Sequence, residues 1–479
     1  MHLLRTLNRW KLPLLIAAAV VIRLAVYFAF PSVFAWDQTG AIHGSSSYDA
    51  YGVNLVDTGV YGLTPGVPDA IIPPAYGYVV AAIYALLGRG SLSIALVHTA
   101  FDAISIALLY DITRRLFKPS GEWVGWLAGA FYAFYPYLIF QNLTLIDTPL
   151  FMLLLHAFVW LIVLLRERDR LDRRFWLLAA AAGIVLGAAA LTRPVIVFLA
   201  LLLPVWFLMR WSIVQSILRL LLVALISVLT LVPWMVRNQA VYGQFVAMSV
   251  TAGSNFYQGN NPDVIPLMRA GYDVQWTAPD PDQIHADPSS PAADSERMQL
   301  AIDWLRANPG TIPELLWVKF LTHWSIDVFP SQNPTSGQDP NATISGDAAV
   351  TIAPPAQGDQ QVDITGLPQG DPVTEYAGGA FALGRVIHRL YFGALLLLAL
   401  IGVLVTRKQW RSVSLLWLVQ ISMTIAYVIF HSSTRYRVPT DPLLFTFSAA
   451  AVVYGFNWIV RGRQRAPQGR MPSERRASV

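Results

Sequence analysis

The chain of 479 residues contains no cysteine, so it forms no disulfide, binds no metal through thiolates and uses no cysteine nucleophile. Charged residues are also scarce, at 13% against 55% hydrophobic residues, and the mean hydropathy is positive. Soluble domains carry about 25% charged residues. The composition therefore predicts an integral, polytopic membrane protein, in which the lipid bilayer replaces water around most of the chain.

Several motifs that would indicate other functions are also missing. The sequence has no glycine-rich phosphate loop, no HExxH pattern and no convincing internal repeat. We therefore expect no required cofactor and assign no metal ligand, while a divalent metal remains open. The net charge of +5 is explained by arginines and lysines in cytoplasmic loops, so it predicts no nucleic-acid partner.

Ten apolar runs are long enough for membrane-spanning helices, which need about 20 residues, or fewer when neighbouring helices shield their ends. The first follows "MHLLRTLNRWK" and is long for a signal peptide, with no convincing cleavage site, so we interpret it as a span. The ten runs are 12–30, 92–112, 121–140, 147–165, 175–192, 195–209, 214–236, 390–406, 412–431 and 441–460.

Charges at the ends of these runs predict how many cross the membrane. The basic N-terminus and the C-terminal "RGRQR" both belong in the cytoplasm, so the number of spans is even. Ten spans also place the basic connectors 113–118, 166–174 and 407–411 inside. The shorter run "PPAYGYVVAAIYALLG" (73–88) is therefore predicted to dip into the interface rather than to cross.

The predicted fold is an all-α polytopic membrane protein with about ten transmembrane helices, cytoplasmic termini, interfacial helices in the first external loop and a mixed extracytoplasmic segment. Within that segment, "AIDWLRANPG" and "PELLWVKFLTHWS" have helical spacing and predict short surface helices. The predicted parts are an N-terminal module 1–236 with its external loop 31–91, the extracytoplasmic segment 237–389, C-terminal helices 390–460 and a disordered cytoplasmic tail 461–479.

Six arginines lie at the external ends of spans, against the prevailing charge bias. A single arginine at a helix end is explained by a side chain that reaches the lipid headgroups. Six near one surface favour a shared role in binding an anion, because the rigid guanidinium fits phosphate oxygens. They are Arg193, Arg237, Arg385, Arg389, Arg435 and Arg437.

Carboxylates on the same side are the second candidate group. Asp37 and Asp49 lie in the first external loop, and Asp147 opens the fourth span. Each has a structural alternative: Asp49 fits an S-x-x-D helix cap, Asp147 lies at a helix N-terminus that favours an anion, and Asp37 fits a solvated loop. Inside the spans, Arg23 and Asp102 should face the bundle interior, and their mutual pairing is left open.

Five motifs, taken together, resemble the lipid-carrier-dependent glycosyltransferases of the GT-C superfamily. The nearest branch is that of protein O-mannosyltransferases and aminoarabinose transferases, similar to glycosyltransferase family 39. The resemblance covers 10–260 and 380–460 and leaves 265–375 uncovered. The motifs are, in order, "YDAYGVNLVDTGVYG", "PPAYGY", "ALTRP", "PWMVRNQAVYGQFV" followed by "SNFYQGNNPD", and "TRYRVPTDPLL".

The resemblance implies a first external loop with a catalytic carboxylate and a cavity that receives a polyprenyl-phosphate sugar. The family has an Asp, or Asp-Glu, shortly before the tyrosine of the loop helix, where this chain has Gly44-Ser45-Ser46. Either Asp49 or Asp37 has taken that role, or the activity is altered or lost.

Transfer from a lipid phosphate requires one carboxylate as general base, because the phosphate leaves without protonation, and a single displacement inverts the sugar carbon. The predicted base is Asp49, with Asp37 as the alternative. The predicted residues for the donor phosphate and the substrate are Arg435, Tyr436, Arg437, Arg193, Arg237, Asn238, Asn260 and Asp147, with Asn238 and Asn260 as sugar or loop-ordering contacts.

The predicted function is thus an inverting transfer of a sugar from a polyprenyl-phosphate carrier to an extracytoplasmic protein, lipid or envelope polysaccharide. The expected location is a bacterial inner (plasma) membrane with the active site on its external face. A flippase or transporter for lipid-linked sugars is the main alternative, although such proteins need repeats and a site at the midplane. A catalytically altered scaffold of GT-C type is the third.

Overall fold

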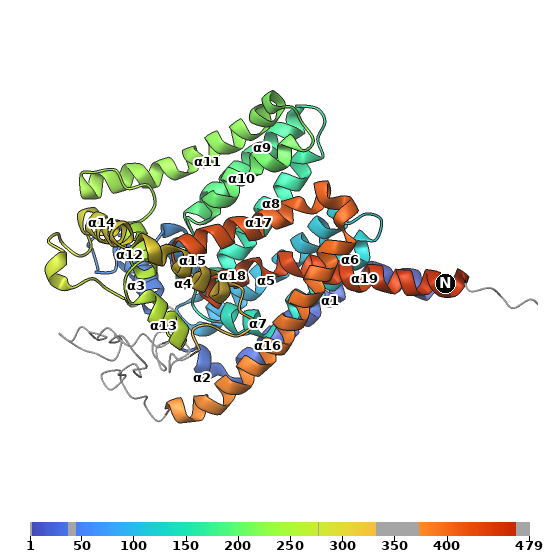
Figure 1. Ribbon diagram of the computed structural model, residues 1–479, viewed down its shortest axis with the longest axis horizontal. Coiled ribbons are helices and arrows are strands. Elements are labelled where there is room, and N and C mark those ends of the chain that lie inside the picture. Colours follow the sequence, from blue (N-terminus) through green and yellow to red (C-terminus); the bar gives the residue numbers. More distant parts are fainter. Residues whose placement is uncertain (1, 37–44, 276, 332–372, 466–479) are drawn as a thin grey trace, which may run out of the picture.

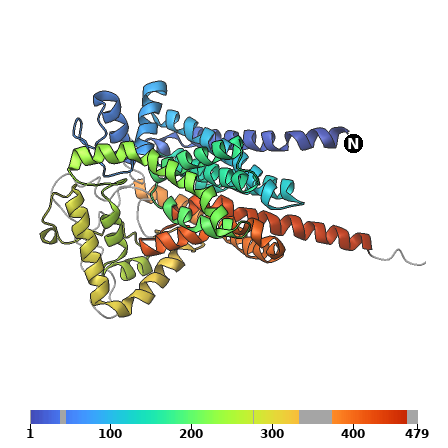
Figure 2. The ribbon, with the colours of Figure 1, turned by 90° about the horizontal axis from the view of Figure 1, so that it is seen from above.

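The computed structural model describes residues 2–36, 45–275, 277–331 and 373–465, and within these ranges the chain is helical with no β-strand (Figure 1). The longer helices run side by side as one bundle. A smaller group of helices covers one end of that bundle (Figure 2). The predicted all-α polytopic membrane fold is confirmed.

Eight helices within the described residues are long and apolar enough to cross a membrane. Two of the ten predicted spans differ from the rest. The run 121–140 forms α6 (Gly121–Ala133) and α7 (Pro136–Leu143), bent by 58° where Pro136 starts the second helix, and α10 (Ile196–Leu208) is short. The eight are α1 (His2–Ala29), α5 (Ser91–Leu116), α8 (Thr148–Arg166), α9 (Arg173–Ala190), α11 (Ile213–Tyr242), α16 (Val373–Val405), α17 (Trp410–Ile429) and α19 (Asp441–Arg465).

The start of α1 and the end of α19 lie at the same end of the bundle, and the smaller helices lie at the other (Figure 2). The predicted tail 461–479 is partly corrected, because α19 continues to Arg465, and 466–479 lies outside the described residues. Similarly, α16 begins well before the predicted start of its span at 390.

The first external loop forms two packed helices, α3 (Ser45–Thr58) and α4 (Pro74–Leu87), preceded by the short α2 (Pro31–Phe34). They approach closely at Gly52, where a Cβ atom would lie 2.5 Å from Val80 Cγ1. At 14 residues, α4 is shorter than a usual span. The loop therefore holds a compact helical hairpin against the bundle.

The described part of the extracytoplasmic segment forms α12 (Ala252–Gly259), α13 (Val264–Ala270), α14 (Pro291–Ala307) and α15 (Ile312–His323). The last two confirm the two helices that the sequence predicts. Buried Val264, Leu267 and Leu315 join in one apolar cluster, so this segment has a core of its own. Residues 332–372 lie outside the described residues.

Inside the bundle, Arg23 and Asp102 form a buried ion pair between α1 and α5. The Asp102 carboxylate also accepts hydrogen bonds from the Tyr132 hydroxyl at 2.5 Å and the Asn142 amide at 2.7 Å. Arg23 on α1, Tyr132 on α6 and Asn142 on α7 thus all donate to this carboxylate. Their contacts offset the free-energy cost of an unpaired charge inside the membrane.

Candidate active site

The candidate site lies at the end of the bundle nearest the small helices and begins with Asp147 and Arg193. Asp147 stands at the N-cap of α8, and Arg193 precedes α10. Their side chains form a two-pronged ion pair, with Nε to Oδ2 at 2.7 Å and Nη2 to Oδ1 at 2.5 Å. The structure therefore brings together two predicted site residues that are 46 positions apart in sequence.

Asp147 is 5% exposed and remains an anion. Burial alone raises the pKa of its carboxyl group, but the charge and hydrogen bonds of Arg193, together with Arg435, outweigh burial and hold the pKa below its ordinary value. Two fixed cations thus act on one carboxylate.

Arg435 is the second cation, on the short helix α18 (Thr434–Arg437). Its guanidinium lies 5.6 Å from the centre of the Tyr436 ring and is half-buried. Among the residues that the structure describes, Arg435 forms neither an ion pair nor a hydrogen bond, and its Nε atom is buried without a partner. An arginine without an ion pair keeps its hydrogen-bond donors available for an anion.

Aromatic side chains surround these charges. Tyr436 stacks on Tyr427 at 5.0 Å between ring centres, and its hydroxyl lies 3.1 Å from Nε2 of His431. Tyr48, from α3, is buried, and burial followed by the negative charge of Asp147 raises its pKa above the ordinary value. Its hydroxyl is therefore protonated and can donate to an oxygen.

A further carboxylate, Asp273, also lies near Arg435, in the loop after α13. Burial raises its pKa, and the positive charge of Arg435 lowers it, with a net rise. Nothing in the sequence distinguishes Asp273 from the other aspartates of the external segment. Its place beside Arg435 follows from the tertiary fold alone.

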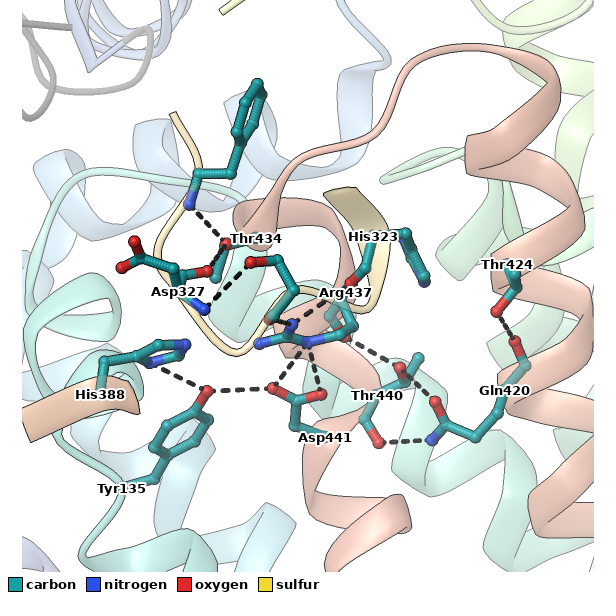
Figure 3. Close-up of polar contacts among 12 residues, drawn as sticks. Tyr135, His323, Asp327, His388, Gln420, Thr424, Thr434, Arg437, Thr440 and Asp441 are labelled. Carbon is teal, nitrogen blue, oxygen red and sulfur yellow. Dashed lines mark hydrogen bonds and ion pairs between the residues drawn. The ribbon is translucent and has the colours of Figure 1, made fainter. Parts of the chain in front are cut away.

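Arg437, two positions after Arg435, has a different environment (Figure 3). Its guanidinium is fully buried and donates to Asp441 at 3.2 Å and to the carbonyl oxygens of His323 and Ser325 at 3.2 and 2.6 Å. The carboxylate of Asp441 also accepts from the Tyr135 hydroxyl at 3.1 Å. The prediction that Arg437 binds the donor phosphate is therefore corrected, because its side chain is inaccessible and joins α18 to α15 and α19.

Arg237 and Asn238 also hold the structure together. Arg237 donates to the carbonyl oxygens of Asp69 at 2.6 Å and of Tyr61 at 2.8 Å, so it fixes the first external loop. Asn238 is buried and donates to the carbonyl oxygen of Val246 at 3.1 Å. The predicted substrate-binding role of Arg237 is corrected, and Asn238 has the loop-ordering role.

The last two external arginines, Arg385 and Arg389, share one partner. Both donate to the carboxylate of Asp327 at 2.5 Å. Of the six external arginines, four are thus paired with carboxylates, Arg237 with carbonyl oxygens, and Arg435 has no such partner within the described ranges.

Asn260 anchors a buried lysine that the sequence analysis did not single out. Its side chain donates to the carbonyl oxygen of Ile429 at 3.1 Å and accepts from Lys319 Nζ at 2.9 Å. Burial lowers the pKa of Lys319 to about 7. Asn260 therefore orders the contact between α12, α15 and the end of α17, rather than a sugar.

Asp49 is paired with Arg89 rather than with Arg435. Its carboxylate accepts from the Tyr84 hydroxyl at 2.7 Å and from Arg89 at 2.9 and 2.5 Å, so it joins α3 to the end of α4. The helix begins at Ser45, which places Asp49 beyond the first turn, so the capping alternative is also excluded. The alternative base, Asp37, lies outside the described residues.

No group of three or more potential metal ligands gathers within the described ranges, and a divalent metal remains an open question. A cavity of about 410 Å³ opens between α12, α14 and the first external loop. Its polar lining includes Thr251, Ser254, Gln258 and Arg297.

Residues 72–236 match the family model of dolichyl-phosphate-mannose-protein mannosyltransferases. This part contains Asp147 and Arg193 but neither Asp49 nor Arg435. No curated protein matches the chain.

Solved structures with a similar fold include the Archaeoglobus fulgidus oligosaccharyltransferase tethered to an acceptor peptide. The TM-score is 0.54 at 13% identity, over 95% of this chain and 51% of that one. The same archaeal enzyme, AglB, with an inhibitory peptide and a dolichol-phosphate gives 0.51 at 14%, over 97% and 53%. This chain thus spans about half the length of these oligosaccharyltransferases.

ArnT from Cupriavidus metallidurans bound to undecaprenyl phosphate is also matched, with a TM-score of 0.40 at 15% identity, over 94% of this chain and 80% of that one. The family-model match over residues 72–236 and the fold shared with the oligosaccharyltransferases bear out the predicted resemblance to GT-C glycosyltransferases.

Proposed function

We propose that the protein is an inverting glycosyltransferase that moves a sugar from a polyprenyl-phosphate carrier to an extracytoplasmic acceptor. One observation carries the proposal: Arg435 forms no ion pair or hydrogen bond in the described part of the chain, whereas the neighbouring Arg193 is paired with Asp147. The family model supports a lipid-phosphate sugar donor, and the dolichol-phosphate in the AglB structure supports a polyprenyl carrier.

The donor phosphate would bind to Arg435, with the Tyr436 ring against the guanidinium. As the bond from the sugar carbon to the phosphate oxygen breaks, negative charge develops on the phosphate. A fixed cation in a water-poor site stabilises that charge without reorganisation, a contribution of several kcal/mol. Arg193 does not bind the phosphate in this arrangement, because its guanidinium is paired with Asp147. Its part is to hold the Asp147 carboxylate in place.

We assign the general base to Asp147 rather than to Asp49. Asp147 lies close enough to Arg435 for its pKa to respond to that cation. Each carboxylate is held by a two-pronged arginine, Asp147 by Arg193 and Asp49 by Arg89, so nearness to Arg435 is what favours Asp147. In one step, Asp147 takes the proton of the acceptor hydroxyl or amine, whose oxygen or nitrogen attacks the sugar carbon, and the phosphate leaves with the electron pair. The sugar carbon is inverted.

The transporter alternative gains no support from the ionisable residues inside the spans. Arg23 and Asp102 are bound to each other, and Asp102 also accepts from Tyr132 and Asn142. A transported substrate would need to replace those contacts. The acceptor stays unassigned between protein, lipid and envelope polysaccharide.

The test uses vesicles that contain the purified full chain and a radiolabelled polyprenyl-phosphate sugar, with candidate acceptors on the exposed face. Label in an acceptor, absent with Arg435→Ala, supports the transferase. Flipping of the lipid without transfer would support the transporter, and saturable binding without either would support the altered scaffold.

A further inference from the structure

The opposite end of the bundle contains a second basic site. A cavity of about 260 Å³ lies beside the ends of α5 and α8, where Arg166 ends the helix that Asp147 begins. Its charged lining consists of Arg115, Lys118, Arg166 and Arg210 with one acid, Glu167. We call this cavity the basic pocket, and the charge bias of the surrounding loops predicts that it faces the cytoplasm.

Two of the four cations already have acidic partners. Arg115 pairs with Asp111 and Glu167, each at 2.6 Å, and Arg210 pairs with Asp169 at 2.7 Å. In the part of the chain that the structure describes, neither Arg166 nor Lys118 forms an ion pair. The pocket thus keeps a net positive charge after the ion pairs of Arg115 and Arg210 are taken into account.

Arg166 is held in position rather than free in solvent. Its guanidinium lies 4.0 Å from the ring centre of Trp206, which is 1% exposed, and it donates to the carbonyl oxygen of Arg411 at 3.1 Å. A side chain fixed by an aromatic face and a carbonyl loses little further entropy when it binds an anion. Its orientation is therefore set before the ligand arrives.

The positive-inside rule explains the sign of these loops but not their arrangement. The rule depends on the number of arginines and lysines near the ends of spans, wherever the side chains point. Here they come from three separate loops and meet around one cavity whose remaining wall includes Trp206 and Leu116. The volume is below the roughly 300–1,000 Å³ that holds a drug-sized ligand, so the pocket fits a head group or a small anion.

We propose that the basic pocket binds a phosphate group, with Arg166 and Lys118 as its cationic ligands. The phosphate belongs either to an anionic phospholipid in the adjoining leaflet or to a free phosphate compound. Basic pockets between helices at the headgroup level bind such lipids. The proposal is independent of the transferase activity, because the pocket and Asp147 lie at opposite ends of α8.

The experiment follows the thermal unfolding of the full chain in detergent during titration with phosphatidylglycerol, phosphatidylcholine or inorganic phosphate, with chloride at equal ionic strength as the salt control. A ligand that binds the folded state raises the unfolding temperature. The variants are Arg166→Gln and, as the matched control, Arg170→Gln, an exposed arginine on the same loop outside the pocket.

Stabilisation by phosphatidylglycerol alone, with about fivefold weaker apparent binding in Arg166→Gln and none of that loss in Arg170→Gln, supports the lipid as the source. Stabilisation by inorganic phosphate as well, with the same dependence on Arg166, supports a free phosphate compound. No phosphate-dependent shift in the wild type, or equal shifts in both variants, overturns the proposal. If Arg166→Gln does not fold, Lys118→Gln replaces it, because Lys118 is exposed and its loss leaves the packing intact.

Discussion

Arg435 and Arg437 are two positions apart on α18, and their surroundings contrast sharply. Around Arg435 lie aromatic rings and the carboxylates of Asp147 and Asp273, but it forms no ion pair with the described residues. Around Arg437 lie Asp441, two carbonyl oxygens and the Phe392 ring at 3.6 Å. Because residues i and i+2 of a helix point about 200° apart, one arginine faces the candidate site and the other the core.

This difference shows why the two arginines cannot be assigned one role from their spacing. A buried arginine with an ion pair and further hydrogen bonds holds the fold together, whereas an arginine without an ion pair can bind a ligand. Variants of these arginines and of the neighbouring carboxylates test whether the two roles are separate.

Arg435→Ala should reduce sugar transfer by about 10²–10³-fold, the typical cost of removing one group that stabilises developing charge. The unfolding temperature should stay that of the wild type, because Arg435 makes no ion pair with the described residues. The measurement is label transfer per folded protein in vesicles. Arg389→Ala is the matched control, since Arg385 remains to pair with Asp327. Equal losses in both variants would remove Arg435 from the site.

Asp147→Asn should lower transfer by about 10²-fold or more through loss of the base, and should also reduce stability, because Arg193 becomes a buried cation without its counterion. Transfer rates per folded molecule separate the two effects. Asp147→Asn with normal transfer would exclude Asp147 as the base and would direct attention to Asp273.

Arg437→Ala should destabilise the protein by about 3–5 kcal/mol, because it leaves Asp441 buried without its partner. Folded material should fall, while each folded molecule keeps its transfer activity. The double variant Arg437→Met, Asp441→Leu should recover most of the lost stability, since it removes both charges. Detergent-solubilised unfolding curves provide the comparison. A fully stable Arg437→Ala with no activity would reverse the roles of the two arginines.

Lys319, on α15, gives the stability of the protein a predictable dependence on pH. Burial lowers its pKa to about 7, below the 10.5 of an unfolded chain, so the unfolded state binds more protons between these values. Stability should therefore rise with pH from about 7 to about 10. Lys319→Met should flatten the rise, as measured by unfolding temperature against pH, and an unchanged slope would show that another group causes it.

Asp49→Asn should change transfer only slightly, within about threefold, because the carboxylate joins α3 to Arg89 and Tyr84. Arg89 is 54% exposed in its side chain, so the lost ion pair contributes less than about 1 kcal/mol. The assay is the one used for Asp147→Asn. Abolished transfer in Asp49→Asn beside normal transfer in Asp147→Asn would restore Asp49 as the base.

The sequence by itself determined the class of fold, because about 20 consecutive apolar residues can hardly be anything but a helix in lipid. It also determined which residues are chemically equipped for the site: Arg193, Arg435, Tyr436 and Asp147 were all singled out by charge and position. Two helices of the external segment followed from their apolar spacing.

Only the tertiary structure decided which of these residues meet. Pairing is a property of three-dimensional neighbours far apart in sequence: Asp147 with Arg193, Arg437 with the carbonyl of His323 at the end of α15, and Asp49 with Arg89. The same holds for Tyr48, Asp273 and Lys319, whose sequence surroundings are ordinary. Residue type determines what a side chain can bind. Burial and the neighbours brought by packing determine whether its donors and acceptors are already used, and those of Arg435 are not used by the described residues.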